Sequence, residues 1–282
     1  MIRGDSIDME ENKNISFHKS FKPETMYIAG ILELACNENT YTIEEISAIT
    51  GIPTGKSSGK VEPHIFYANY MGLIDFEKQG KNIYKIKQTK LGEIVYKEDP
   101  NLQERLTLIL CHAMMLRDEY GAAMWRILFK TIMPKYKNNI SRDILDRELE
   151  RNFDKKITTR NISVVMSSYQ DMFATLDILT ESAGSWVVKP IELDNEFIIL
   201  YGYILLDCWE KTFPCQDEIS AKQFESLDYG SIFGWNEKME YEVIIALSDR
   251  GIIRLNRQLV PYTMLRLASK ENIVNKLYSE LC

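Results

Sequence analysis

The sequence lacks long hydrophobic runs, closely spaced cysteines and histidine-rich stretches. Its longest apolar run, from Phe197 to Leu206, is far shorter than the roughly 20 residues that a membrane-spanning helix needs. Residues 1–14 are polar and acidic and lack the apolar core of a signal peptide, so we expect a flexible tail there. The five cysteines are scattered without a C-x-x-C pair, which argues against a zinc site or a disulfide framework. These absences predict a cytoplasmic protein with no membrane partner.

The charge of the chain reverses locally. The 282 residues carry a formal net charge of −7, and 45% of them are hydrophobic, which is enough for a packed core. Between Pro53 and Lys90, however, seven lysines stand against three acids. A basic patch on an acidic protein is what a nucleic-acid-binding face needs, because phosphate neutralisation supplies most non-specific affinity.

The same stretch has the pattern of a winged helix. Thr42 and Glu45 form a capping box that starts a short helix, and the sequence from Gly51 to Pro53 ends it. A second helix is predicted over residues 60–71, with Gly72 after its end. Strands are expected at residues 73–76 and 83–86, joined by a turn. Helix, helix and hairpin in this order predict a DNA-binding domain over residues 15–98.

Several polar residues of this domain are candidates for contacts with double-stranded DNA. They lie on the approach to the second helix, on that helix and on the hairpin, the parts of a winged helix that usually meet DNA. An alternative is that these lysines only solvate a surface. The segment from Gly51 to Ser57 also resembles a phosphate-binding loop, but it is one residue short and follows a helix instead of a strand. The candidates are Lys56, Ser57, Ser58, Lys60, His64, Lys78, Lys81, Lys85 and Lys87.

The remaining chain predicts a mainly α protein with small β-hairpins. Helical periodicity continues over residues 99–180, which we expect to form a helical middle domain, and residues 186–188 predict a short strand. Residues 181–282 are expected to form a C-terminal helical, winged-helix-like domain. Its helices are predicted at 197–209, 220–227 and 237–249, and its paired strands at 252–255 and 263–267.

Seven short motifs resemble a known bacterial family. They are Phe17-His18 followed by Phe21, Leu91-Gly92, and the stretches from Asp99 to Leu102, Leu110 to His112, Trp125 to Phe129, Leu206 to Trp209 and Tyr229 to Phe233. In this order and spacing the sequence resembles the SspB-type components of bacterial DNA phosphorothioation defence systems. The resemblance covers about residues 15–267.

The resemblance implies a function in single-strand phosphorothioation. SspB-type proteins are thought to nick DNA so that sulfur can be incorporated, which would make this chain a metal-dependent nicking endonuclease using Mg²⁺ or Mn²⁺. The partners would be a cysteine desulfurase, an ATP pyrophosphatase and an ATPase. Two alternatives stay open: a non-catalytic DNA-binding adaptor of that machinery, and a winged-helix transcription regulator.

Three residues are candidates for catalysis, although none belongs to a recognised nuclease motif. Asp207 follows a nearly all-apolar helical stretch, where a carboxylate is costly unless it is paired. His18 lies between two phenylalanines, and His112 ends an apolar helix. Each residue has a structural alternative: an ion pair for Asp207, and a hydrogen-bonded core position for His18 and His112. The sequence identifies no metal ligands.

Overall fold

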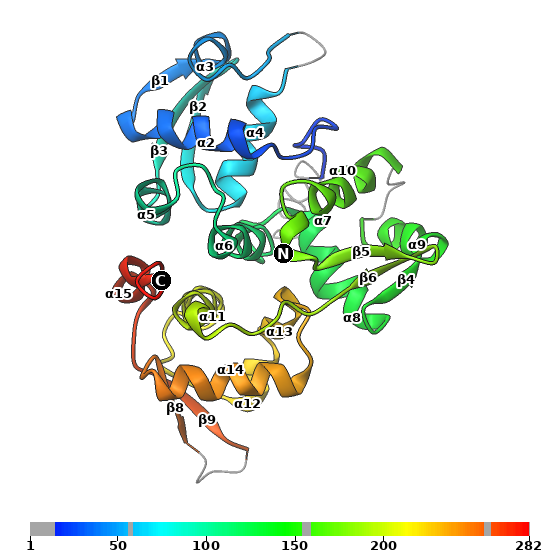
Figure 1. Ribbon diagram of the computed structural model, residues 1–282, viewed down its shortest axis with the longest axis vertical. Coiled ribbons are helices and arrows are strands. Elements are labelled where there is room, and N and C mark those ends of the chain that lie inside the picture. The colour runs from blue at the N-terminus through cyan, green and yellow to red at the C-terminus, as the bar shows by residue number, and fades with distance from the viewer. Residues whose placement is uncertain (1–14, 56–58, 154–158, 257–260, 282) are drawn as a thin grey trace, which may run out of the picture. The chain divides into compact units, whose positions relative to one another are not determined.

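The computed structural model describes residues 15–55, 59–153, 159–256 and 261–281 (Figure 1). The chain divides after Val188 into two compact units, which are described separately. Both are mainly helical and carry small three-stranded antiparallel sheets, so the predicted fold class is confirmed. Among the described helices, none is both long and apolar enough to cross a membrane.

The first unit begins with a winged helix. Its sheet has the order β1-β3-β2, with both pairs antiparallel. The second and third helices pack against this sheet and the first helix packs on both of them, while a 3-10 turn at Ala35–Asn37 links the first helix to the first strand. The elements are α2 (Thr25–Leu34), β1 (Thr40–Thr42), α3 (Ile43–Thr50), α4 (Val61–Tyr70), β2 (Ile74–Gly80) and β3 (Ile83–Gln88).

Local sequence signals account for the boundaries of α3 and α4. The Thr42 hydroxyl accepts a hydrogen bond from the Glu45 amide at 3.1 Å, and the Glu45 carboxylate accepts one from the Thr42 amide at 2.7 Å. This is the predicted capping box. Gly51 and Gly72 follow the two helices with φ values of 72° and 73°, where glycine has no steric cost.

A second winged helix follows in the same unit, where the sequence predicted helices and one strand. Five elements lead to it: α5 (Lys90–Glu98), α6 (Arg105–Met115), α7 (Ala123–Arg126), a π-helical turn (Ile127–Ile132) and α8 (Met133–Lys135). The strands pair antiparallel in the order β4-β6-β5. Its own elements are β4 (Asn139–Ser141), α9 (Arg142–Phe153), α10 (Thr159–Gln170), β5 (Leu179–Ser182) and β6 (Ser185–Val188), with a 3-10 turn at Ala174–Leu176.

The segment 99–180, predicted as a helical domain, thus also contains the strand β4 and the start of β5. The strand predicted at residues 186–188 is present as part of β6. It is the central strand, and it pairs with β4, whose residues are more than forty positions away in the chain. Strands of three and four residues carry too little alternation to be recognised locally, and their stability comes from this long-range pairing.

The second unit repeats the same topology. Its strands again pair antiparallel, in the order β7-β9-β8. Ser220 and Gln223 form a second capping box at the start of α12. The elements are a 3-10 turn (Asn195–Phe197), α11 (Ile198–Thr212), β7 (Glu218–Ser220), α12 (Ala221–Glu225), α13 (Tyr229–Ile232), α14 (Glu237–Asp249), β8 (Ile253–Asn256), β9 (Thr263–Arg266), α15 (Lys270–Ile273) and a final 3-10 turn (Val274–Lys276).

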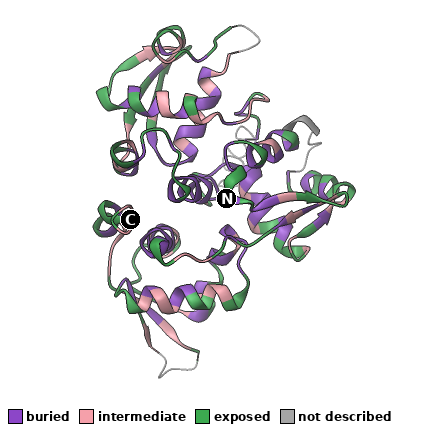
Figure 2. Cartoon of the chain, viewed as in Figure 1, coloured by how far each residue is buried: buried purple, intermediate pink, exposed green. Residues whose placement is uncertain are grey.

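Three winged helices thus follow one another along the chain, two in the first unit and one in the second. In each, the first strand pairs with the last one, and the last two strands form a hairpin. Buried residues lie on the helix faces turned toward each unit's interior (Figure 2). Because the topology repeats, each winged helix has a helix before its hairpin, in the position of a recognition helix.

Candidate functional site

Two lysines beside the first hairpin are neutralised by Glu62. Its carboxylate Oε1 lies 2.9 Å from the Lys78 Nζ, and Oε2 pairs with the Lys19 Nζ. The Tyr84 hydroxyl donates to the same carboxylate. Burial alone would raise the pKa of Glu62, but the hydrogen bonds from Lys19, Tyr84 and Lys78 together lower it to about 2. Lys78 is exposed, so a phosphate could reach it only in competition with Glu62.

Lys60 has an internal partner as well. Its Nζ lies 2.6 Å from the Glu24 Oε1, and it also lies over the ring faces of Phe21 and Tyr27, at 5.7 and 5.4 Å from the ring centres. Only 26% of its side chain is exposed. Lys60 therefore holds the segment before α2 against the start of α4, which does not fit a dedicated phosphate contact.

His64 is buried, so it does not fit the predicted contact with DNA. Its Nε2 accepts a hydrogen bond from the Glu24 amide at 3.1 Å, and its Nδ1 lies 2.7 Å from the Lys60 carbonyl. These two bonds require a neutral ring with the proton on Nδ1. Burial lowers the pKa of His64, which also favours that form. Helix α2 covers His64. The residue pattern of α4 alone does not show that another helix covers this side chain.

The hairpin itself presents exposed lysines. Lys81 lies at its turn, while Lys85 and Lys87 lie on β3, and all three side chains are exposed. Lys87 is 4.0 Å from the Asp75 carboxylate, a loose and exposed pair. Lys85 is the cross-strand neighbour of Glu77. The wing is thus the part of the predicted DNA face that keeps accessible positive charge in the described chain.

Three predicted contacts, Lys56, Ser57 and Ser58, lie outside the described residues. The segment that contains them begins at Gly51, the C-cap of α3. A nucleotide-binding loop of the G-x-x-x-x-G-K-[ST] type follows a buried strand. The preceding element here is a helix, so the structural context of such a loop is missing.

His18 lies in an aromatic part of the core. It is 1% exposed, its Nδ1 accepts a hydrogen bond from the Ser20 amide at 3.0 Å, and its ring meets Phe17 and Trp125 edge-on. Burial lowers the pKa of His18 to about 4, and a backbone interaction with Ile15 offsets only part of this effect. The ring is therefore neutral at pH 7.

His112 occupies a second aromatic cluster of the same unit. It has no exposed surface, and its Nδ1 lies 2.8 Å from the Tyr169 hydroxyl. Phe129 and Phe173 contact the ring at centroid distances of 5.0 and 6.2 Å. This is the hydrogen-bonded core position that the sequence left open as the alternative to catalysis.

Asp207 belongs to the second unit and is neutralised by two lysines. It is 2% exposed, with Oδ1 at 2.8 Å from the Lys270 Nζ and Oδ2 at 3.1 Å from the Lys211 Nζ. The pair with Lys270 joins α11 to α15. The three predicted catalytic residues thus have three separate sets of partners.

Each of the three winged helices contains a carboxylate that pairs with two cations: Glu62, Glu148 and Asp207. Glu148, which the sequence analysis missed, is 3% exposed and lies 2.8 Å from both Lys135 and Arg151. Such a carboxylate is already compensated and would have to lose its partners before binding a cation. In the described part of the chain, no group of three or more His, Cys, Asp or Glu side chains could hold a metal ion. A cation at Glu62, Glu148 or Asp207 would have to replace the lysine or arginine that now pairs with that carboxylate.

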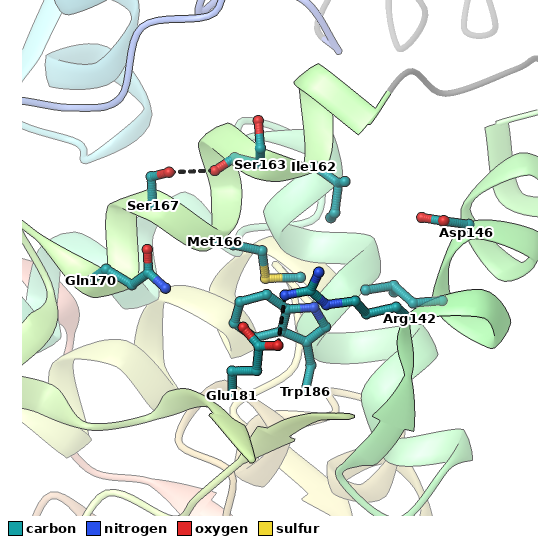
Figure 3. A pocket seen from close by; sticks show the side chains of 10 residues that line it. Arg142, Asp146, Ile162, Ser163, Met166, Ser167, Gln170, Glu181 and Trp186 are labelled. Atoms are coloured by element: carbon teal, nitrogen blue, oxygen red, sulfur yellow. Dashed lines mark hydrogen bonds and ion pairs between the residues drawn. The ribbon is translucent and has the colours of Figure 1, made fainter. Parts of the chain in front are cut away.

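The second winged helix contains a cavity of about 390 Å³ that the sequence analysis also missed (Figure 3). Helices α9 and α10 and the hairpin β5–β6 surround it. At its centre the Arg142 guanidinium lies over the Trp186 ring and donates to Glu181 at 2.6 Å. The only local signal was Trp186 in a predicted strand, because Arg142 and Glu181 are brought to it by folding.

Comparison with known proteins supports the fold. No family model and no curated protein matches the sequence. Two solved structures are similar: a crystal structure of SspB, with a TM-score of 0.75 and 14% identity, and a magnesium ion-bound crystal structure of SspB, with a TM-score of 0.70 and 13% identity. Each match covers 94% of this chain and 88% of the other chain. The predicted resemblance to SspB is thus confirmed at the level of the fold.

Proposed function

We propose that the protein is a DNA-binding component of a bacterial DNA phosphorothioation system and acts in the cytoplasm. The observation that carries this proposal is the SspB fold over 94% of the chain. Because a fold can host several functions, the proposal also rests on the SspB-like sequence motifs and on the basic wing. Its partners would be double-stranded DNA and a cysteine desulfurase, an ATP pyrophosphatase and an ATPase.

The first winged helix is the proposed DNA-binding face. Lys81 and Lys85 on the wing are exposed and can reach phosphates directly. Lys78 and Lys19 add to this face when phosphate oxygens replace Glu62 as their partner. Contacts of this kind give affinity that depends strongly on salt and little on sequence.

A salt titration tests this face. Double-stranded DNA binding is measured by gel shift across a range of salt concentrations for the wild type and for a Lys81→Ala/Lys85→Ala variant. Each lost phosphate contact lowers the slope of log K against log salt by about 0.9, so we expect a decrease of about 2. The control is Lys90→Ala/Lys97→Ala, which removes the same charge from α5. Equal slopes for both double variants would place the binding face elsewhere.

We propose DNA nicking as the activity to test, because the SspB-type resemblance implies it. The magnesium ion in one SspB structure supports the choice of Mg²⁺, with Mn²⁺ as an alternative. The test is relaxation of supercoiled plasmid in Mg²⁺, Mn²⁺ or EDTA, by the wild type and by His18→Gln, His112→Gln and Asp207→Asn. Metal-dependent open circles that survive repeated purification would support a nickase.

A non-catalytic adaptor is the second candidate. A specific observation favours it: His18, His112 and Asp207 are all buried and bonded to internal groups. An adaptor would shift DNA in the gel but leave the plasmid intact under every metal condition. A wild-type protein that neither binds DNA nor relaxes plasmid would contradict both candidates.

A further inference from the structure

The cavity of the second winged helix has the size and the walls of a ligand site. Its volume of about 390 Å³ falls in the range of small-molecule pockets. Leu145 and Met166 are apolar residues of its lining, and the Gln170 amide on α10 provides a polar group at one side (Figure 3). Helix α10 precedes the β5–β6 hairpin, so it is the helix of the second winged helix that corresponds to a recognition helix. The cavity borders this helix.

The centre of the cavity is a fixed aromatic surface beside a carboxylate. Trp186 and Glu181 are cross-strand neighbours in the β5–β6 hairpin, so the backbone sets their relative position. The Trp186 ring is covered by Arg142, whose guanidinium carbon lies 5.8 Å from the ring centre. The Arg142 side chain is 59% exposed, and Glu181 is 36% exposed. The covering group can therefore move into solvent more easily than the two groups beneath it.

The electrostatics of the cavity favour N–H donors over anions. Among the described residues that line the cavity, Arg142 is the one cation, and it stands against Glu181 and Asp146. A free phosphate would meet a net negative charge on these three side chains. The hydrogen bond from Arg142 engages Oε1 of Glu181, and a carboxylate can accept two parallel N–H donors through its two oxygens.

Arg142 shows which chemical group these walls hold. Its guanidinium is flat, lies over an indole and donates an N–H group to a carboxylate. Guanine contains the same arrangement in its N1–H and 2-amino groups, attached to a larger aromatic ring. Adenine, cytosine and thymine do not present two adjacent donor groups on their Watson–Crick edge. A base can stack in this way only when it is unstacked from its neighbours.

We propose that this cavity binds an unstacked guanine base, which stacks on Trp186 and donates its N1–H and 2-amino group to Glu181. The base takes the place of the Arg142 guanidinium, which then turns toward the phosphate of the same nucleotide. The proposal rests on the proposed function for its biological ligand, a guanine in DNA. The binding itself requires only the nucleoside.

Nucleosides test the cavity without DNA. Binding of guanosine, inosine and adenosine to the full-length protein is measured by calorimetry for the wild type, Glu181→Gln and Glu150→Gln. Glu150 is an exposed residue of α9 outside the cavity, so its variant controls for charge. Inosine lacks the 2-amino group. We expect guanosine to bind the wild type and Glu150→Gln about tenfold more tightly than inosine, and Glu181→Gln to lose this preference.

Arg142→Ala gives a second, independent test. Removing the competing guanidinium should strengthen guanosine binding. In the wild type, guanosine monophosphate should bind more tightly than guanosine because Arg142 contacts its phosphate, and Arg142→Ala should lose this difference. Three results would each overturn the proposal. They are equal affinity for guanosine, inosine and adenosine, no binding of guanosine to a folded wild type, and identical nucleoside binding by Glu181→Gln and Glu150→Gln. Preferential binding of inorganic phosphate would overturn it as well.

Different results would contradict the proposed DNA-binding function and the proposed guanine site. Guanosine binding with no gel shift would leave the cavity assigned and remove the DNA-binding function. A salt-dependent gel shift that needs Lys81 and Lys85, with no guanosine binding, would remove only the inference about the cavity. Circular dichroism spectra and melting curves of each variant confirm that it is folded.

Discussion

Glu62 at the start of α4 and Lys78 on the wing strand β2 form an ion pair, with 2.9 Å between Oε1 and Nζ. The same carboxylate pairs with Lys19 from the segment before α2. A single acid thus neutralises two lysines at the face where DNA is proposed to bind. Glu62 therefore links the helix, the wing and the N-terminal segment.

Replacing Glu62 with Gln should therefore strengthen DNA binding. The variant leaves Lys19 and Lys78 without a charged partner, so each can neutralise a phosphate. We expect a several-fold tighter complex at low salt and a salt slope steeper by about 1 to 2. Glu44→Gln is the control, since Glu44 is an exposed acid of the neighbouring helix α3. If the two variants bind DNA equally, Glu62 does not restrain these lysines.

This restraint explains why the basic patch was only partly interpretable from sequence. The excess of lysines over acids between Pro53 and Lys90 is real, but a charge count does not show which lysines are paired. Lys60 pairs with Glu24, which lies outside the counted stretch. Glu62 was counted as one charge, although it contacts two lysines. Pairing depends on tertiary contacts that sequence spacing does not encode.

The fold was more predictable than the site, for a physical reason. Capping boxes, helix-ending glycines and the first hairpin are local signals, and the structure contains them at Thr42, Gly72 and β2–β3. The second winged helix depends on a strand of three residues that pairs far along the chain. His64 shows the same limit for a single side chain, because the amide that bonds its Nε2 belongs to Glu24, 40 positions earlier in the chain.

Substitution of Asp207 separates a structural role from a catalytic one. Asp207→Asn leaves Lys270 and Lys211 without their buried counter-charge, so we expect a loss of about 2 to 4 kcal/mol in the free energy of unfolding. The control is Asp217→Asn, which breaks an exposed pair with Arg266 and should cost less than about 1 kcal/mol. Urea denaturation measures both.

The two variants also bear on nicking. If Asp207 is structural, any plasmid relaxation by Asp207→Asn should scale with its folded fraction. A fully folded Asp207→Asn protein that has lost metal-dependent relaxation, while Asp217→Asn keeps it, would contradict the structural assignment and point to catalysis.

His18 should make the protein sensitive to moderate acid. Its pKa is about 4 in the folded state, against 6.5 for an ordinary histidine, so the unfolded chain binds a proton first as the pH falls. The contribution of the buried neutral ring is complete above pH 6.5 and is lost as the pH falls toward 4. The full loss amounts to about 3 kcal/mol in the free energy of unfolding.

The difference between the wild type and His18→Gln isolates this effect. Urea denaturation at several pH values should show that the advantage of the wild type over His18→Gln shrinks between pH 6.5 and pH 4. A difference that is constant over this range would mean that His18 titrates normally or is protonated in the folded protein.

Gly92 should be intolerant of any side chain. A Cβ atom there would lie 1.8 Å from the Leu73 carbonyl oxygen and 2.8 Å from the Leu73 carbonyl carbon, so the backbone itself would have to move. The approach is fixed by Thr89, whose hydroxyl accepts from the Gly92 amide at 2.9 Å and whose amide donates to the Leu73 carbonyl at 3.0 Å. These bonds hold the start of α5 against the link between α4 and β2.

We expect Gly92→Ala to lower the free energy of unfolding by several kcal/mol, the range of severe steric changes in a packed interior. Gly30→Ala is the matched control, since its Cβ would lie 3.4 Å from the nearest atom, the Thr50 Cβ, in a helix where alanine is favoured. Urea denaturation that gives both variants the same midpoint would contradict the close approach. A selective loss in Gly92→Ala would mean that the Leu91-Gly92 motif, which resembles SspB-type proteins, reflects packing of the fold, so its presence alone says nothing about catalysis.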